Sequence, residues 1–189
     1  FAQAVTLTDL LAARRPGFRE SAQLVAAIAD ALQYAHDHGL IHRDVKPSNV
    51  MIGDDGTPFV MDFGLAKREA GEITMTLDGQ VLGTPAYMAP EQARGESHRV
   101  GPRADVYALG VVLYQLLTGE LPFSGSNDAH LMFLHLEELA PSPRKLVPSL
   151  PRDLETICLK CLEKEPARRY ADCQALADDL RRLLAGRAG

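Results

Sequence analysis

LIHRDVKPSNVMI, residues 40–52, places a histidine, an arginine, an aspartate, a lysine and an asparagine between two apolar flanks. Polar groups beside a core lose hydration, and this loss is unfavourable unless hydrogen bonds or ion pairs replace it. We therefore expect this stretch to form a polar site at the edge of a buried core. The five residues are His42, Arg43, Asp44, Lys46 and Asn49.

Composition and charge limit the class of protein. The 189 residues, 46% of them hydrophobic, are enough for one domain with a core or for a large part of a bigger one. The net charge of −5 arises from 20 basic and 25 acidic residues spread along the chain, without the basic stripe that neutralises a phosphate backbone. Nucleic acid is therefore not expected as a partner.

The sequence also lacks signals for export or membrane insertion. No apolar run approaches the roughly 18 residues that cross a bilayer, and the first residues do not resemble a signal peptide. Three cysteines do not make a disulfide framework and fit a reducing compartment, so we expect a cytoplasmic protein. Because the chain begins with Phe1 rather than Met, we expect it to be part of a longer polypeptide, with room for a membrane anchor outside these residues.

The hydrophobic pattern predicts a mainly α protein with one small β-hairpin. Between Gly17 and Gly39 we expect a helix of about five turns. Residues 104–117 are apolar on nearly all sides, which is typical of a helix in the centre of a domain. Apolar residues at helical spacing predict further helices near residues 127–138, 154–162 and 176–184.

The hairpin is predicted directly after the opening stretch. Val50–Ile52 and Phe59–Met61 are short apolar runs, and residues 54–58 between them are typical of a turn. Residues 65–85 show no period and few large apolar side chains, so we expect a long loop there. Loops of that length in compact domains are usually functional.

A second acidic segment, MDFGLA at residues 61–66, follows the hairpin. A hairpin folds its ends back together, so we expect Asp44, Asn49 and Asp62 to converge. Two carboxylates and an amide suit Mg²⁺, which binds few protein oxygens and fills its shell with water and phosphate oxygens. The pattern therefore indicates phosphoryl transfer.

The chain resembles the C-terminal lobe of eukaryotic-type (Hanks-type) bacterial serine/threonine protein kinases, whose fold is α+β. The resemblance covers about residues 7–185, so that residues 1–189 would be one partial kinase domain with an activation segment at 62–91. The motifs that carry it are HRD at 42–44 with Asn49, DFG at 62–64 and APE at 89–91.

The resemblance implies roles for the polar residues. Asp44 would accept or orient the proton of the attacking hydroxyl group. Lys46 would lie beside the transferred phosphate and offset its charge, as in serine/threonine kinases. Asn49 and Asp62 would hold Mg²⁺, or Mn²⁺ in its place, which bridges the phosphates of ATP. Thr84 would contact the catalytic aspartate and shape the platform for the substrate residue after the hydroxyl.

The same resemblance assigns residues to regulation and scaffolding. Arg43 would receive a phosphate on the activation segment, with Thr74 and Thr76 as candidate acceptors. The implied partners are protein substrates and, for autophosphorylation in trans, a second copy of the chain. The implied structural residues are His42, Phe63, Gly64, Glu91, Asp105 and Arg169.

Three of these structural assignments have a specific form. Glu91 and Arg169 would make a buried ion pair that fastens the activation segment to the helical lobe. Asp105 is either an acid that favours a helix N-terminus or a scaffold under the catalytic loop, and the resemblance favours the scaffold. His42 and Phe63 are expected to fill the core.

Two further patterns are found in metal sites. Cys158 and Cys161 form a C-x-x-C pair, but they lie on the apolar face of a predicted helix, and we expect core cysteines. His36 and His38 precede His42 without an acidic or cysteine cluster to complete a metal site.

The family's G-x-G-x-x-G loop and strand lysine are missing from this sequence, so we expect the N-terminal lobe to be absent from the chain. The first 18 residues or so resemble the end of the hinge between the lobes and the short helix that follows it. Because these groups hold ATP, the isolated chain is expected to lose most of its activity.

Two functions follow from the sequence. The first is a protein serine/threonine kinase that transfers the γ-phosphate of ATP to hydroxyl groups of proteins. The second is a truncated, kinase-like binding or regulatory module that acts through its activation segment or a groove around Leu131, Phe133 and Leu136. A metal-dependent phosphatase that uses Asp44 and Asp62 would not explain the lysine and the long loop.

Overall fold

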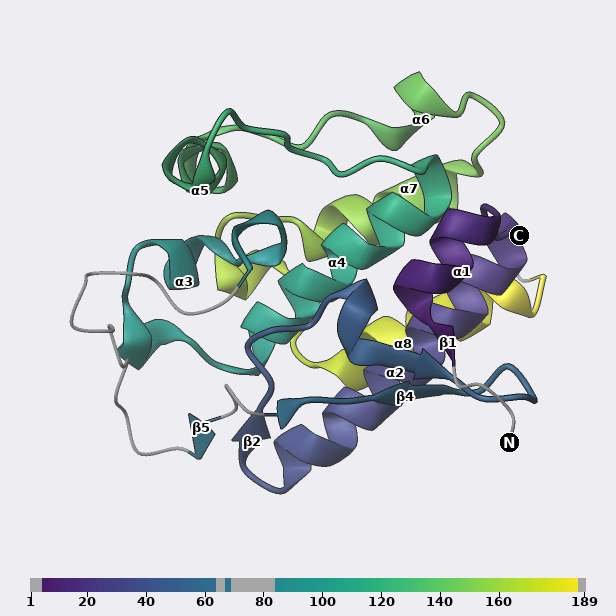
Figure 1. Cartoon of the computed structure of the whole chain (residues 1–189), viewed down its shortest axis with the longest axis horizontal. Coiled ribbons are helices and arrows are strands. Elements are labelled where there is room, and N and C mark those ends of the chain that lie inside the picture. The colour runs from purple at the N-terminus through teal and green to yellow at the C-terminus, as the bar shows by residue number, and fades with distance from the viewer. Residues whose placement is uncertain (1–4, 64–66, 69–83, 187–189) are drawn as a thin grey trace.

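A computed structural model describes residues 5–63, 67–68 and 84–186 of the chain. At its centre, helix α4 (Pro102–Thr118) is buried from Ala104 to Thr118 except at Gln115, and it lies between the other long helices (Figure 1). The helix ends where Gly119 adopts a φ of 77°, a left-handed conformation that suits glycine. The central helix predicted from the sequence is confirmed and is slightly longer at both ends.

Three helices pack around α4. Helix α2 (Phe18–Asp37) contacts both α4 and α8 (Cys173–Leu184), while α7 (Arg152–Cys161) packs on α4. The contact with α7 requires a glycine, because a Cβ atom at Gly110 would overlap the Cβ atom of Cys161. These helices match the predicted segments, and their apolar faces form one core.

Shorter elements surround this core. In Figure 1, α5 (Asp128–Glu137) and α6 (Pro143–Leu146) lie on the side of α7, and the strands lie on the side of α2. Helix α1 (Leu7–Ala13) begins with a capping box in which Thr6 and Asp9 exchange hydrogen bonds. The remaining short elements are α3 (Pro90–Ala93), η1 (Pro47–Asn49), η3 (Pro85–Tyr87), η4 (Ser97–Arg99) and η5 (Pro166–Arg168).

The strands form two small antiparallel sheets. In the first, β3 (Val50–Ile52) pairs with both β1 (Val5–Thr6) and β4 (Pro58–Val60), with Met51 opposite Phe59. The predicted hairpin is therefore confirmed, although its second strand begins one residue earlier than expected. Met61 lies outside the strand pairing, and its N–H donates to the carbonyl oxygen of Asn49 at 2.7 Å.

The second sheet corrects the prediction of a continuous loop over residues 65–85. Within that range β5 (Lys67–Arg68) pairs with β2 (Leu40–Ile41), so the loop prediction is wrong at these two positions. A two-residue strand is too short to show a hydrophobic period, and its pairing depends on a partner that is distant in the sequence. Most of the remaining range, including Thr74 and Thr76, lies outside the described residues.

The structure is mainly helical with small antiparallel sheets, as the sequence predicts. None of its described helices combines the length and the apolar character that crossing a bilayer requires.

Candidate active site

Asp44, Lys46 and Thr84 form one polar cluster, although Thr84 comes from a distant segment. The hydroxyl group of Thr84 donates to Oδ1 of Asp44 at 3.0 Å and accepts from Nζ of Lys46 at 2.6 Å. Lys46 Nζ also lies 3.3 Å from Oδ2 of Asp44. The side chains of Asp44 and Lys46 are 13% and 25% exposed, so both are partly accessible from solvent.

Asp105 fixes the backbone just before this cluster. Its two carboxylate oxygens accept from the N–H groups of His42 and Arg43, each at 2.9 Å. Asp105 is 1% exposed and is the second residue of the buried run of α4. Asp105 therefore holds the backbone of residues 42 and 43, in addition to lying in the first turn of a helix.

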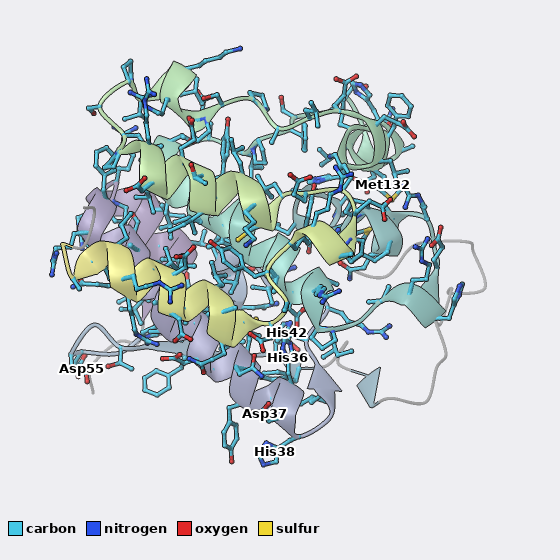
Figure 2. The ribbon with its side chains drawn as sticks, turned by 180° about the vertical axis from the view of Figure 1, so that it is seen from behind. His36, Asp37, His38, His42, Asp55 and Met132 are labelled. Carbon is cyan, nitrogen blue, oxygen red and sulfur yellow. The ribbon has the colours of Figure 1, made fainter. Side chains whose placement is uncertain are left out.

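His36 is a scaffold residue that sequence reasoning missed. Its Nε2 atom lies 2.7 Å from Oδ2 of Asp105, and both side chains are almost completely buried. Figure 2 shows His36 and His42 close together near the end of α2. One signal was present in the sequence: His36 follows the buried Leu32 by four residues, so it lies on the apolar face of α2, where a polar group needs a partner.

Arg43 has an unusual backbone and a half-buried guanidinium group. Its φ of 69° is left-handed, which is uncommon for a residue with a long side chain. Burial lowers the pKa of Arg43 from its usual value, and the charge of Asp105 opposes this shift. Its Nε atom is buried and has no hydrogen-bond partner in the described part of the chain.

Asn49 and Asp62 lie at the two ends of the β3–β4 hairpin. The side-chain NH₂ group of Asn49 donates to the backbone oxygen of Asp44 at 2.8 Å, which leaves the side-chain oxygen as its ligand atom. The 2.7 Å hydrogen bond from Met61 N–H to the Asn49 carbonyl oxygen places Asp62 one residue beyond this link. An amide oxygen and an exposed carboxylate are ligands of the kind that Mg²⁺ prefers, so the donor set fits this ion.

His42 joins the hairpin to the loop. Its Nδ1 atom accepts from the N–H of Asp44 at 3.1 Å, and its Nε2 atom donates to the carbonyl oxygen of Met61 at 2.9 Å. The ring of Phe63 contacts the ring of His42 edge-on, with centroids 4.6 Å apart. Phe63 is only partly buried, whereas His42 is completely buried. Gly64, the third residue of the DFG motif, lies outside the described residues.

Glu91 and Arg169 form the buried ion pair that the family resemblance implies. Two hydrogen bonds of 2.7 and 2.9 Å join the guanidinium group to the carboxylate, and the side chains are 0% and 3% exposed for arginine and glutamate. The pair joins α3 to the segment before α8, which lies 78 residues later in the chain.

Helix α4 also contacts η3 near its other end. The hydroxyl group of Tyr87 donates to Oε1 of Gln115 at 2.6 Å. Burial raises the pKa of Tyr87 to about 12, so the phenol remains protonated at neutral pH. The segment after Thr84 is thereby held on the same helix that carries Asp105.

Cys158 and Cys161 belong to the core, as predicted. The thiol of Cys158 lies 3.6 Å from the carbonyl oxygen of Gly110, and burial raises the pKa of Cys161 to about 12. Both cysteines are therefore protonated thiols at neutral pH.

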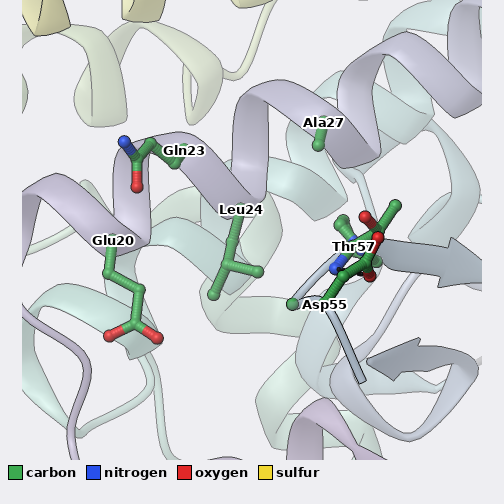
Figure 3. Close-up of a pocket in the computed structure, with 8 residues that line it drawn as sticks. Glu20, Gln23, Leu24, Ala27, Asp55 and Thr57 are labelled. Atoms are coloured by element: carbon green, nitrogen blue, oxygen red, sulfur yellow. Dashed lines mark hydrogen bonds between the residues drawn. The ribbon is translucent and has the colours of Figure 1, made fainter. Parts of the chain in front are cut away.

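A separate groove of about 360 Å³ lies between α2 and the turn of the hairpin (Figure 3). None of the predicted catalytic residues lines it. Its two carboxylates already have partners, because Glu20 pairs with Arg14 and Asp55 accepts from the N–H of Thr57. The groove is therefore separate from the Asp44 cluster, and its lining carboxylates are engaged in other contacts.

Comparison with known proteins identifies the family. A family model described as protein kinase domain matches residues 1–180. The serine/threonine-protein kinase PknB of Mycobacterium leprae (strain TN) is 39% identical over 187 residues, which cover 98% of this chain and 30% of that relative. PknB of Mycobacterium tuberculosis (strain ATCC 25618 / H37Rv) is 40% identical over 185 residues, or 97% of this chain and 29% of that relative.

A third relative, the probable serine/threonine-protein kinase PknB of Bifidobacterium longum (strain NCC 2705), is 41% identical over 163 residues, or 86% of this chain and 23% of that protein. The chain thus spans less than a third of the length of these curated relatives. Since the family model covers nearly all of the 189 residues, the chain belongs to the protein kinase domain family.

Proposed function

We propose that this chain carries the catalytic loop and part of the substrate-binding surface of a serine/threonine protein kinase. The enzyme transfers the γ-phosphate of ATP to serine and threonine hydroxyl groups of protein substrates. The observation that carries this proposal is the Asp44–Lys46–Thr84 cluster, in which an accessible carboxylate, a cation and a hydroxyl group lie within 3.3 Å of one another. The names of the relatives supply the substrate class.

In this function Asp44 accepts the proton of the attacking hydroxyl group as the new oxygen–phosphorus bond forms and the bond from the γ-phosphorus to the β–γ bridging oxygen breaks, which releases ADP. Thr84 and Lys46 orient the two carboxylate oxygens, and Lys46 offsets the negative charge of the transferred phosphoryl group. Because Asp105 holds the preceding peptides, the carboxylate is positioned before the substrate binds.

Asn49 and Asp62 would hold a divalent cation, Mg²⁺ or Mn²⁺. The ion would supply positive charge that neutralises part of the negative charge of the ATP phosphates. Asn49 is pre-oriented for the task by its hydrogen bond to the Asp44 backbone. The 189 residues contain no G-x-G-x-x-G sequence, so we assign the remaining contacts to ATP to an N-terminal lobe outside this chain.

We further assign regulation to Arg43. Its half-buried guanidinium group, with an Nε atom that lacks a partner in the described residues, suits a phosphate on the activation segment, residues 62–91. Thr74 and Thr76 are the candidate acceptors, modified in trans by a second copy of the protein in the cytoplasm. The alternative of a binding module would use Phe133, which is 52% exposed, but it gives no reason for the polar cluster at Asp44.

The test compares Asp44→Asn with the wild type in the full-length protein, using labelled Mg²⁺-ATP and a mixture of serine and threonine peptides. We expect transfer to fall by about 10²–10⁴-fold, because an amide cannot accept the proton. Binding of a fluorescent ATP analogue should stay within about twofold. Asp54→Asn, on the exposed hairpin turn, is the matched control and should leave transfer unchanged. If Asp44→Asn keeps at least half of the wild-type rate, Asp44 is not the base.

A further inference from the structure

The peptide groups on both sides of Arg43 are held by side chains from two different helices. The N–H of Arg43 donates to Asp105 of α4 at 2.9 Å, and its carbonyl oxygen accepts from Nε2 of Gln92 at 3.0 Å. Between these two contacts the backbone has the left-handed φ of 69°. Such a conformation is unfavourable for a residue with a side chain and persists only where its surroundings enforce it.

Gln92 is well suited to hold the carbonyl oxygen of Arg43. It lies on α3, is 9% exposed and accepts from the N–H of Ala89 at 3.0 Å through Oε1. Its amide is therefore fixed at both ends: the oxygen faces an N–H donor and the nitrogen faces a carbonyl acceptor. The amide of glutamine supplies this donor and this acceptor at any pH, whereas a carboxyl group of the same length donates only when it is protonated.

We propose that Gln92 is a positioning residue that couples the end of the activation segment to the catalytic loop. Through the carbonyl oxygen of Arg43, it holds the peptide that leads into Asp44. This inference rests on the proposed kinase function and extends it. Without the hydrogen bond from Gln92, the Arg43–Asp44 peptide can rotate, and a small displacement of a reacting group lowers the rate strongly.

The first test uses Gln92→Met in the full-length protein, because methionine has nearly the same length and no donor. We expect kcat to fall about tenfold, with KM for ATP within about twofold of the wild type. Gln174→Met, at an exposed glutamine of α8, is the matched control and should change neither constant. Leu176→Val, at a fully buried residue of the same helix, controls for a general loss of stability.

A second variant separates positioning from packing. In Gln92→Glu the carboxylate can still accept from Ala89 N–H, but it can donate to the Arg43 carbonyl oxygen only when protonated. Burial beside that oxygen disfavours the charge and raises the pKa of the new carboxyl group. The ratio of its kcat to the wild-type kcat should therefore rise as the pH falls from 8 to 6.

Three results would overturn the proposal. The first is a kcat for Gln92→Met within twofold of the wild type. The second is a loss no greater than that of Leu176→Val at the same decrease in Tm. The third is a ratio for Gln92→Glu that does not change with pH.

If the wild-type protein transfers no phosphate, the kinase proposal fails and hydrogen exchange decides on Gln92. Amides of residues 40–49 should then exchange faster in Gln92→Met than in Leu176→Val. Equal exchange in the two variants would reject the positioning role.

Discussion

The Arg169–Glu91 pair and the Lys46–Asp44 pair are both contacts between a cation and a carboxylate, but they differ in burial and in the number of their partners. Arg169 uses all five of its N–H donors, two on Glu91 and three on the carbonyl oxygens of Glu163, Arg103 and Lys164. Asp44 and Lys46 are partly exposed, and their contacts leave room for further ones. The buried Arg169–Glu91 pair, called the dry pair below, has all its donors in hydrogen bonds and stabilises the fold. The partly exposed Lys46–Asp44 pair, called the accessible pair, has capacity for further contacts and is available for chemistry.

The largest expected effect on stability comes from breaking the dry pair. Arg169→Met leaves the Glu91 carboxylate buried without its cation, and we expect unfolding to become easier by about 3–5 kcal/mol. Thermal or denaturant unfolding of the full-length protein measures this loss. Arg181→Met, which removes the exposed pair with Asp30, is the matched control and should cost less than about 1 kcal/mol. Equal losses in the two variants would contradict the distinction between the pairs.

A somewhat smaller effect should follow a change in pH, because His135 belongs to the same dry region. Its Nδ1 lies 2.8 Å from the hydroxyl group of Tyr107, whose ring contacts the Arg169 guanidinium group. Burial, followed by the charge of Lys164, lowers the pKa of His135 to about 4. Between pH 6.5 and 4 the unfolded chain therefore binds a proton that the folded chain does not, and stability falls as the pH decreases.

The loss across this pH range should amount to about 3 kcal/mol. The measurement is the difference in unfolding free energy between the wild type and His135→Asn at pH 7 and at pH 4.5. Since asparagine does not titrate, the variant should lose less stability on acidification. A variant that loses as much as the wild type would show that His135 does not cause the acid sensitivity.

The smallest expected change in free energy is at the accessible pair, and it concerns the rate. Lys46→Met should lower kcat by about 100-fold, because the phosphoryl group loses its nearby cation. Stability should change by less than about 0.5 kcal/mol, since the side chain is 25% exposed. Steady-state kinetics and unfolding of the same preparation test both parts. A large loss of stability with a normal kcat would show that Lys46 stabilises the fold and does not contribute to the reaction.

Sequence reasoning predicted the parts of the molecule in which a local pattern was sufficient. The helical period of α2, the nearly all-round apolar character of α4 and the turn residues of the hairpin indicated those elements directly. The motifs indicated which polar residues gather, and the contact between Thr84 and Asp44 spans 40 residues of sequence. That contact came from the family resemblance, since no local pattern encodes it.

The features that were missed depend on tertiary contacts. His36 acquires its role only because α2 passes the start of α4, where Asp105 lies. Gln92 is one polar residue in a four-residue helix, and its partner is a backbone oxygen 49 positions earlier. The pairing of β2 with β5 involves two residues on each strand, too few for a recognisable alternation.

Helix α4 carries two side chains, called anchors here, that hold other segments in place, and this limits how the packing of the helix can change in evolution. Asp105 holds the catalytic loop and Gln115 holds η3, so the anchors are ten residues apart, or about 15 Å along a rigid rod. Gly110 lies midway between them, where α7 approaches without room for a methyl group. A mutation there that shifts the rod would move both anchors together, so an evolutionary change in packing at this point would also displace the backbone that leads into Asp44.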